Sequence, residues 1–170
     1  MPKNVLFKSI LLATAIAGAL DILWAALLTI WRGRSILAML QFVASGPFPT
    51  AVDWGLMGGF AGLGVHFGLM AIMAGVFMLA WMHFDQMPRH PLWSGLGYGV
   101  VTYAVLDLVV VPLRFPAAWP PSPLSVATQL FAHLVLVGLV FATVARRWMG
   151  ASGELSNVSA SPRRAIGGAG

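Results

Sequence analysis

Four long apolar stretches, separated by short segments with polar residues, dominate the chain. They cover residues 9–31, 54–81, 93–113 and 123–144. About 20 apolar residues are enough for a helix to cross the hydrocarbon core of a membrane. Open strands would leave backbone groups unpaired in lipid. We therefore predict four transmembrane helices, the last of which begins at Pro123 with Ser122 as its N-cap.

The connector between the first two stretches contains a shorter apolar segment. Residues 35–44 are apolar, with Gln41 among them, and Gly46 and Pro47 follow. This segment is too short to span a membrane. It therefore predicts an interfacial or re-entrant helix on the outer side.

The composition is that of a membrane protein. Hydrophobic residues make up 59% of the chain and charged residues 9%, whereas a soluble domain has about 25% charged residues. The net charge is +5, but the basic residues lie at the ends of the apolar stretches and in the C-terminal tail. We therefore expect a lipid bilayer, and not nucleic acid, as the partner. Cysteine is absent, which excludes disulfides and thiolate metal sites.

The distribution of Lys and Arg predicts the orientation of the chain. Seven of these residues fall at the N-terminus, in the loop 83–90 and after the last stretch, whereas Arg32, Arg34 and Arg114 fall on the other side. This excess favours cytoplasmic N- and C-termini. We predict a multi-pass protein of the bacterial inner membrane, folded as an all-α antiparallel four-helix bundle. Residues 1–149 form its transmembrane domain, and residues 150–170 form a disordered cytoplasmic tail.

Each predicted span carries one strongly polar titratable residue. They are Asp21, His66, Asp107 and His133. Such residues are costly in a membrane and usually face a bundle interior or a water-filled cavity. At about 1.5 Å per residue, each lies roughly 10–18 Å inside the outer end of its span. We therefore expect the four side chains to lie in one layer, between the middle of the membrane and its outer face.

Further polar residues fall in the same layer. Tyr103 precedes Asp107 by four residues and Gln129 precedes His133 by four, so each shares a helix face with its partner. Pro112 cannot donate a hydrogen bond to the carbonyl of Leu108. A free acceptor, and a kink in the helix, are therefore expected beside the acid.

Three hypotheses remain open for the role of this layer. In the first, the polar side chains form a proton or ion pathway, because histidine changes charge near neutral pH. In the second, they only hold the helices together by hydrogen bonds, in a structural or accessory membrane protein. In the third, they bind a metal or a haem group.

We predict no cofactor, although two sets of ligands keep the third hypothesis open. His66, Met70 and Met73 share a helix face, and imidazole with thioether suits copper. His66 and His133 lie at similar depths on different helices, an arrangement compatible with haem. The sequence contains no phosphate loop or hydrolase motif, and it favours a protein without enzymatic activity.

Glycines four residues apart occur repeatedly in the second and third stretches. The pairs are Gly55 and Gly59, Gly58 and Gly62, Gly64 and Gly68, and Gly95 and Gly99. Small residues at this spacing let helices approach closely. We expect tight packing within the bundle and a homo-oligomer. The sequence identifies no protein partner.

A series of short motifs runs through the last three stretches. In order, they are His66-Phe67, Trp93-Ser94-Gly95-Leu96-Gly97-Tyr98-Gly99, Pro112-Leu113, His133-Leu134-Val135 and Arg146-Arg147. In their order and spacing they resemble the uncharacterised YagU-like bacterial inner-membrane proteins. The resemblance implies an inner-membrane helical bundle with no established activity. That family also places histidines near the positions of His66 and His133, but it supplies no catalytic residue.

Overall fold

The computed structural model describes residues 3–160, which form helices and connecting turns without any strand. Four of the helices are long and apolar enough to cross a membrane. They are Lys3–Trp31, Leu56–His83, Pro91–Arg114 and Pro123–Gly150. The number, order and approximate position of the four long apolar helices are therefore as predicted.

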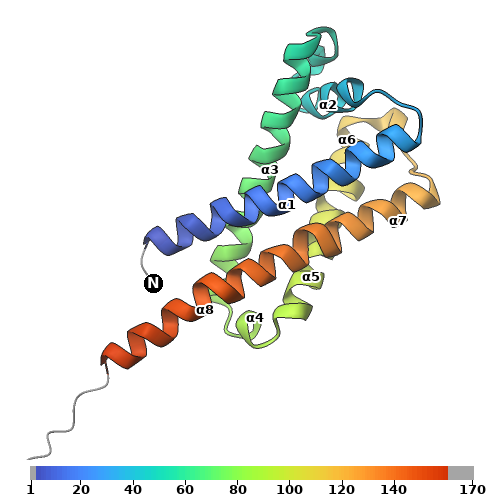
Figure 1. The fold of residues 1–170 in the computed structure, drawn as a ribbon. Helices are drawn as coiled ribbons and strands as arrows, with labels where there is room; N and C mark the ends of the chain where they lie inside the picture. Colours follow the sequence, from blue (N-terminus) through green and yellow to red (C-terminus); the bar gives the residue numbers. More distant parts are fainter. Residues whose placement is uncertain (1–2, 161–170) are drawn as a thin grey trace, which may run out of the picture.

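The helical elements are named in chain order. They are α1 (Lys3–Trp31), α2 (Ile36–Ala44), η1 (Pro49–Asp53), α3 (Leu56–His83), α4 (Gln86–Arg89), α5 (Pro91–Tyr103), η2 (Ala104–Val110), α6 (Val111–Arg114), η3 (Pro116–Ala118), α7 (Pro123–Phe131), η4 (Ala132–Leu139) and α8 (Val140–Ala160). The third span consists of α5, η2 and α6. The fourth consists of α7, η4 and the first part of α8 (Figure 1).

Helix α8 continues to Ala160, beyond the point where the sequence predicts a disordered tail. No proline occurs between Pro123 and Pro162, so no residue in this stretch lacks the backbone donor that a helix requires. Residues 161–170 of the predicted tail lie outside the described residues.

Helix α1 lies beside α7 and α8 along much of its length (Figure 1). Near one end of the contact, the ring of Trp24 packs on Phe131 with 5.0 Å between centroids. The indole Nε1 also donates a hydrogen bond to the carbonyl of Thr128. Near the other end, Leu12 and Trp148 line the same shallow pocket. Early residues of α1 thus lie near α8, and late residues lie near α7.

An apolar core fills the region where α3, α5 and α8 meet. Phe77 is fully buried, and its ring lies 5.0 Å from that of Tyr98 and 5.9 Å from that of Phe141. The hydroxyl of Tyr98 donates to the carbonyl of Met73. Large apolar side chains also cover the outward faces of the long helices, as lipid contact requires, and Leu23 remains 65% exposed.

Helix α2 packs on the beginning of α3 because glycines in α3 leave room for it. A Cβ added at Gly59 would lie 2.7 Å from the side chain of Leu37, and one at Gly62 would collide with the backbone of Leu40. The side-chain amide of Gln41 donates to the carbonyl of Gly55.

Arg114, at the end of α6, holds α2 from the opposite side. Its Nε and Nη2 donate to the carbonyls of Gly46 and Ser45, at 2.7 and 2.8 Å. These carbonyls follow the end of α2, where backbone acceptors have no partner within the helix. The adjoining ring of Phe115 packs on Phe42, with 4.3 Å between centroids. The ends of α2 and α6 are therefore tied together.

The third and fourth spans approach each other through glycines. A Cβ at Gly95 would lie 2.7 Å from the carbonyl oxygen of Gly138. A Cβ at Gly99 would lie 2.5 Å from the carbonyl oxygen of His133 and 2.7 Å from the Cα of Leu134. Both obstacles are backbone atoms, which cannot move aside as a flexible side chain does. Glycine at these two positions therefore determines how closely α5 lies against η4.

We expect Gly99→Ala to lower the free energy of unfolding by about 1–3 kcal/mol, the usual cost of overpacking. Gly97→Ala, in the same helix, is the matched control, because a Cβ there would meet nothing within 4 Å. The measurement is reversible denaturation of both variants in lipid–detergent micelles. Equal stabilities would contradict the close backbone contact at Gly99.

Candidate functional site

The four polar residues singled out in the sequence form two Asp–His pairs. Nδ1 of His66 on α3 lies 3.9 Å from Oδ2 of Asp21 on α1. Nε2 of His133 on η4 lies 3.2 Å from Oδ2 of Asp107 on η2. Helix α1, which carries Asp21, also packs against η4, which carries His133. The two pairs therefore belong to one polar layer that joins all four spans.

The backbone of α1 orients the imidazole of His66. Its Nε2 lies 2.9 Å from the carbonyl oxygen of Gly18. A carbonyl oxygen only accepts, so Nε2 must carry the hydrogen. Nδ1 then faces Asp21 at 3.9 Å, a distance at which a protonated imidazole attracts the carboxylate without a direct hydrogen bond. The first pair is therefore the looser of the two.

Both ring nitrogens of His133 have polar neighbours. Nδ1 lies 3.0 Å from Oγ1 of Thr102, while Nε2 faces Asp107. The same Thr102 hydroxyl lies 3.1 Å from the carbonyl oxygen of Gly99. A hydroxyl has one hydrogen, so Thr102 donates either to Gly99 or to Nδ1 of His133. His133 therefore keeps a hydrogen-bond partner at Nδ1 whether or not that nitrogen is protonated.

The tighter pair lies in two π-helical segments. Asp107 is part of η2 and His133 is part of η4. A π turn widens the helix by one residue and is often found at functional sites. For η2 the cause is in the sequence: Pro112 follows at once, lacks a backbone donor and crowds the preceding turn. The helix is therefore irregular beside the acid, while the expected kink stays a prediction.

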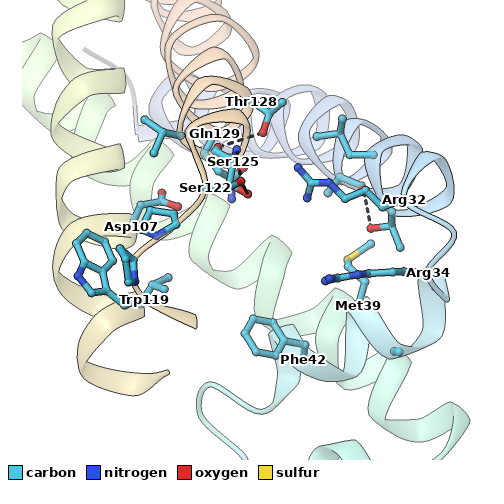
Figure 2. Close-up of a pocket in the computed structure, with 18 of the residues that line it drawn as sticks. Arg32, Arg34, Met39, Phe42, Asp107, Trp119, Ser122, Ser125, Thr128 and Gln129 are labelled. Atoms are coloured by element: carbon cyan, nitrogen blue, oxygen red, sulfur yellow. Dashed lines mark hydrogen bonds between the residues drawn. The ribbon is translucent and has the colours of Figure 1, made fainter. Parts of the chain in front are cut away.

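A cavity of about 730 Å³ reaches the tighter pair from one end of the bundle. Asp107, Tyr103 and Gln129 are among its lining residues. Arg32 and Arg34, which follow α1, line the opposite wall. Figure 2 shows their side chains extending toward the wall that bears Asp107 and Trp119. The Asp107 side chain is 16% exposed, so this carboxylate is in contact with the cavity.

Tyr103 and Gln129 differ in how they take part in this site. The ring of Tyr103 stands edge-on to the imidazole of His133, with 6.0 Å between centroids. Gln129 lies at the cavity wall and has no side-chain hydrogen bond to any described residue. The amide of Gln129 is therefore open to a ligand or to water.

The copper and haem hypotheses gain no support from the arrangement. Met70 and Met73 are buried in the apolar core with Phe77 and Trp81. Within residues 3–160, no three His, Asp or Glu side chains are grouped closely enough to hold a metal ion.

Thr102 and the cavity were not predicted from the sequence. Thr102 is three residues after Gly99 and one before Tyr103, so the close glycine contact places it beside the fourth span. The cavity involves Arg32 and Arg34, which the sequence analysis used only to predict orientation. The sequence did contain one signal for their position. Gly33 lies between the two arginines directly after a long helix, where a glycine commonly ends the helix and turns the chain.

Comparison of the chain with protein-family models, with curated proteins and with solved structures found no match. The resemblance to YagU-like proteins therefore stays a prediction from the motifs. What the fold itself supports is a class: four long apolar helices, with apolar outward faces, fit a multi-pass membrane protein.

We expect Thr102→Val to lower the free energy of unfolding by about 1 kcal/mol, because it removes the hydroxyl beside Nδ1 of buried His133. Thr143→Val is the matched control, since the Thr143 hydroxyl bonds only to the backbone of its own helix at an exposed position. Nitrogen NMR of labelled histidine should also show a shift of the His133 Nδ1 signal in Thr102→Val alone. An unchanged His133 signal would refute the contact.

Proposed function

We propose that this protein conducts protons across the bacterial inner membrane through the two Asp–His pairs. The observation that carries the proposal is the position of Asp107: its carboxylate contacts both a cavity and the imidazole of His133. A pair that only held helices together would need no access from outside the bundle. Access is what a proton-transfer group requires.

The hydrogen bonds around His133 allow a proton to be taken up and released without movement of heavy atoms. When Thr102 donates to Gly99, Nδ1–H of His133 donates to Thr102, and Nε2 is free to accept a proton from Asp107. The product is an imidazolium beside a carboxylate, a favourable charge pair. The proton leaves again from Nε2 to the carboxylate, and Nδ1–H keeps its hydrogen bond to Thr102 throughout.

The looser pair, Asp21 and His66, offers a continuation on the other side of the layer. Asp21 lies one turn from Ala25, which lines the cavity, and its helix packs against η4, which carries His133. The hydroxyl of Thr14 is buried two turns further along the same face of α1 and has no hydrogen-bond partner among residues 3–160. Asp21, His66 and Thr14 would thus lead protons toward the N-terminal end of α1.

The orientation belongs to the same proposal. With both termini in the cytoplasm and the spans antiparallel, the cavity and α2 face the outer side, as the excess of Lys and Arg at the other end favours. Protons would then enter at Asp107 from outside and leave near the N-terminus.

We expect Asp107→Asn to abolish proton flux, because an amide cannot exchange a proton at neutral pH. His66→Ala should lower the flux as well. The matched controls are Asp85→Asn and His83→Ala, which change exposed residues at the opposite end of the bundle. The measurement is dye-reported acidification of liposomes that hold each purified variant, under a potassium-clamped membrane potential.

Wild-type flux equal to that of empty liposomes would overturn the proposal. If the Asp107 and His66 variants then only melted at lower temperature, the layer would be structural. Flux that persisted in folded Asp107→Asn would exclude Asp107 from the path.

A further inference from the structure

We propose that the cavity binds a small organic anion, whose acid group lies between Arg32 and Arg34. The cavity volume of about 730 Å³ falls in the range of small-molecule sites, which is about 300–1,000 Å³. Its walls come from segments far apart in the sequence: the end of α1, the helix α2, the junction of η2 and α6, and the start of α7. The proposal goes beyond proton conduction and does not depend on it.

The two arginines are free to bind a ligand. Arg114, the third arginine at this end, uses its guanidinium on the carbonyls of Ser45 and Gly46. Arg32 and Arg34 make no ion pair or side-chain hydrogen bond with any described residue. They also lie at the end of the bundle that has fewer Lys and Arg residues. The excess of basic residues expected on the cytoplasmic side therefore does not account for them.

A rigid turn holds both arginines at the cavity. Gly33 has φ +66°, and its N–H donates to the carbonyl of Ile30. The N–H of Arg34 donates to the carbonyl of Thr29, which completes a glycine-based helix stop. The chain therefore folds back after α1, and both guanidinium groups extend into the same space (Figure 2).

The rest of the lining suits an organic acid and not a bare metal cation. Met39, Phe42 and Trp119 give the cavity apolar surface for a hydrocarbon body. Gln129 supplies an amide that has no partner among the described side chains. The carboxylate of Asp107 faces His133. Two guanidinium groups thus outweigh one carboxylate, and guanidinium binds carboxylate or phosphate oxygens in a bidentate manner.

The test is equilibrium binding of radiolabelled benzoate, and separately of inorganic phosphate, to the full chain in phosphatidylcholine nanodiscs. We expect saturable binding of at least one probe to the wild type. Arg32→Gln combined with Arg34→Gln should weaken it about tenfold or more, the effect of losing roughly 1.4 kcal/mol. The matched control is Arg146→Gln with Arg147→Gln, an equal change of charge at exposed positions on α8, which should bind as the wild type does.

Nanodiscs with added phosphatidylglycerol distinguish the two sources of an anionic group. If benzoate still binds in nanodiscs that contain phosphatidylglycerol, the site is assigned to a soluble anion. Competition by phosphatidylglycerol that requires Arg32 and Arg34 assigns it to a lipid headgroup. Absence of saturable binding by any of these three probes would overturn the proposal, as would equal affinities in the two double variants. Binding is measured separately from proton flux. Absence of anion binding would therefore not contradict the proton pathway, and absence of proton flux would not contradict the anion site.

Discussion

The close contact between the third and fourth spans is the constraint on which the polar layer depends. Gly95 and Gly99 let the backbone of α5 touch that of η4, at Gly138 and at His133. This contact brings the short side chain of Thr102 within 3.0 Å of an imidazole on another helix. It also brings Asp107, one turn further along, within 3.2 Å of the other ring nitrogen. With larger residues at these glycines, the histidine would face a gap in an apolar interior, where an unpaired polar group is costly.

The two halves of the bundle serve different purposes. Around Phe77, aromatic rings fill the space between α3, α5 and α8, and the hydroxyl of Tyr98 donates to the carbonyl of Met73. At the other end, α2 and the segments around Arg114 enclose a cavity in place of a packed core. Packing at one end therefore fixes the helices, and the helices in turn hold open a space at the other end. The polar layer lies between the two.

Much of this could be predicted from the sequence. The spans follow from apolar length alone, and the depths of Asp21, His66, Asp107 and His133 follow from the helical rise. Which aspartate meets which histidine could not be predicted, because the rotation of each helix depends on side-chain packing between helices. Thr102 was missed for the same reason, since nothing local distinguishes a threonine that faces a neighbouring helix from one that faces lipid. The helical path of residues 150–160 was also not expected, because composition favoured disorder.

The two π-helical segments have a consequence for how this chain tolerates changes in length. A π turn contains one residue more than an α turn at almost the same height, so it amounts to an insertion within a helix. Deletion of one residue from η4 would restore a regular α-helix without breaking the span. Every later residue of α8 would then rotate by about 100° relative to the residues before η4. The face of α8 that packs on Phe77 through Phe141 would turn toward lipid. The extra residue beside His133 therefore sets the angular register of the whole C-terminal half of that span.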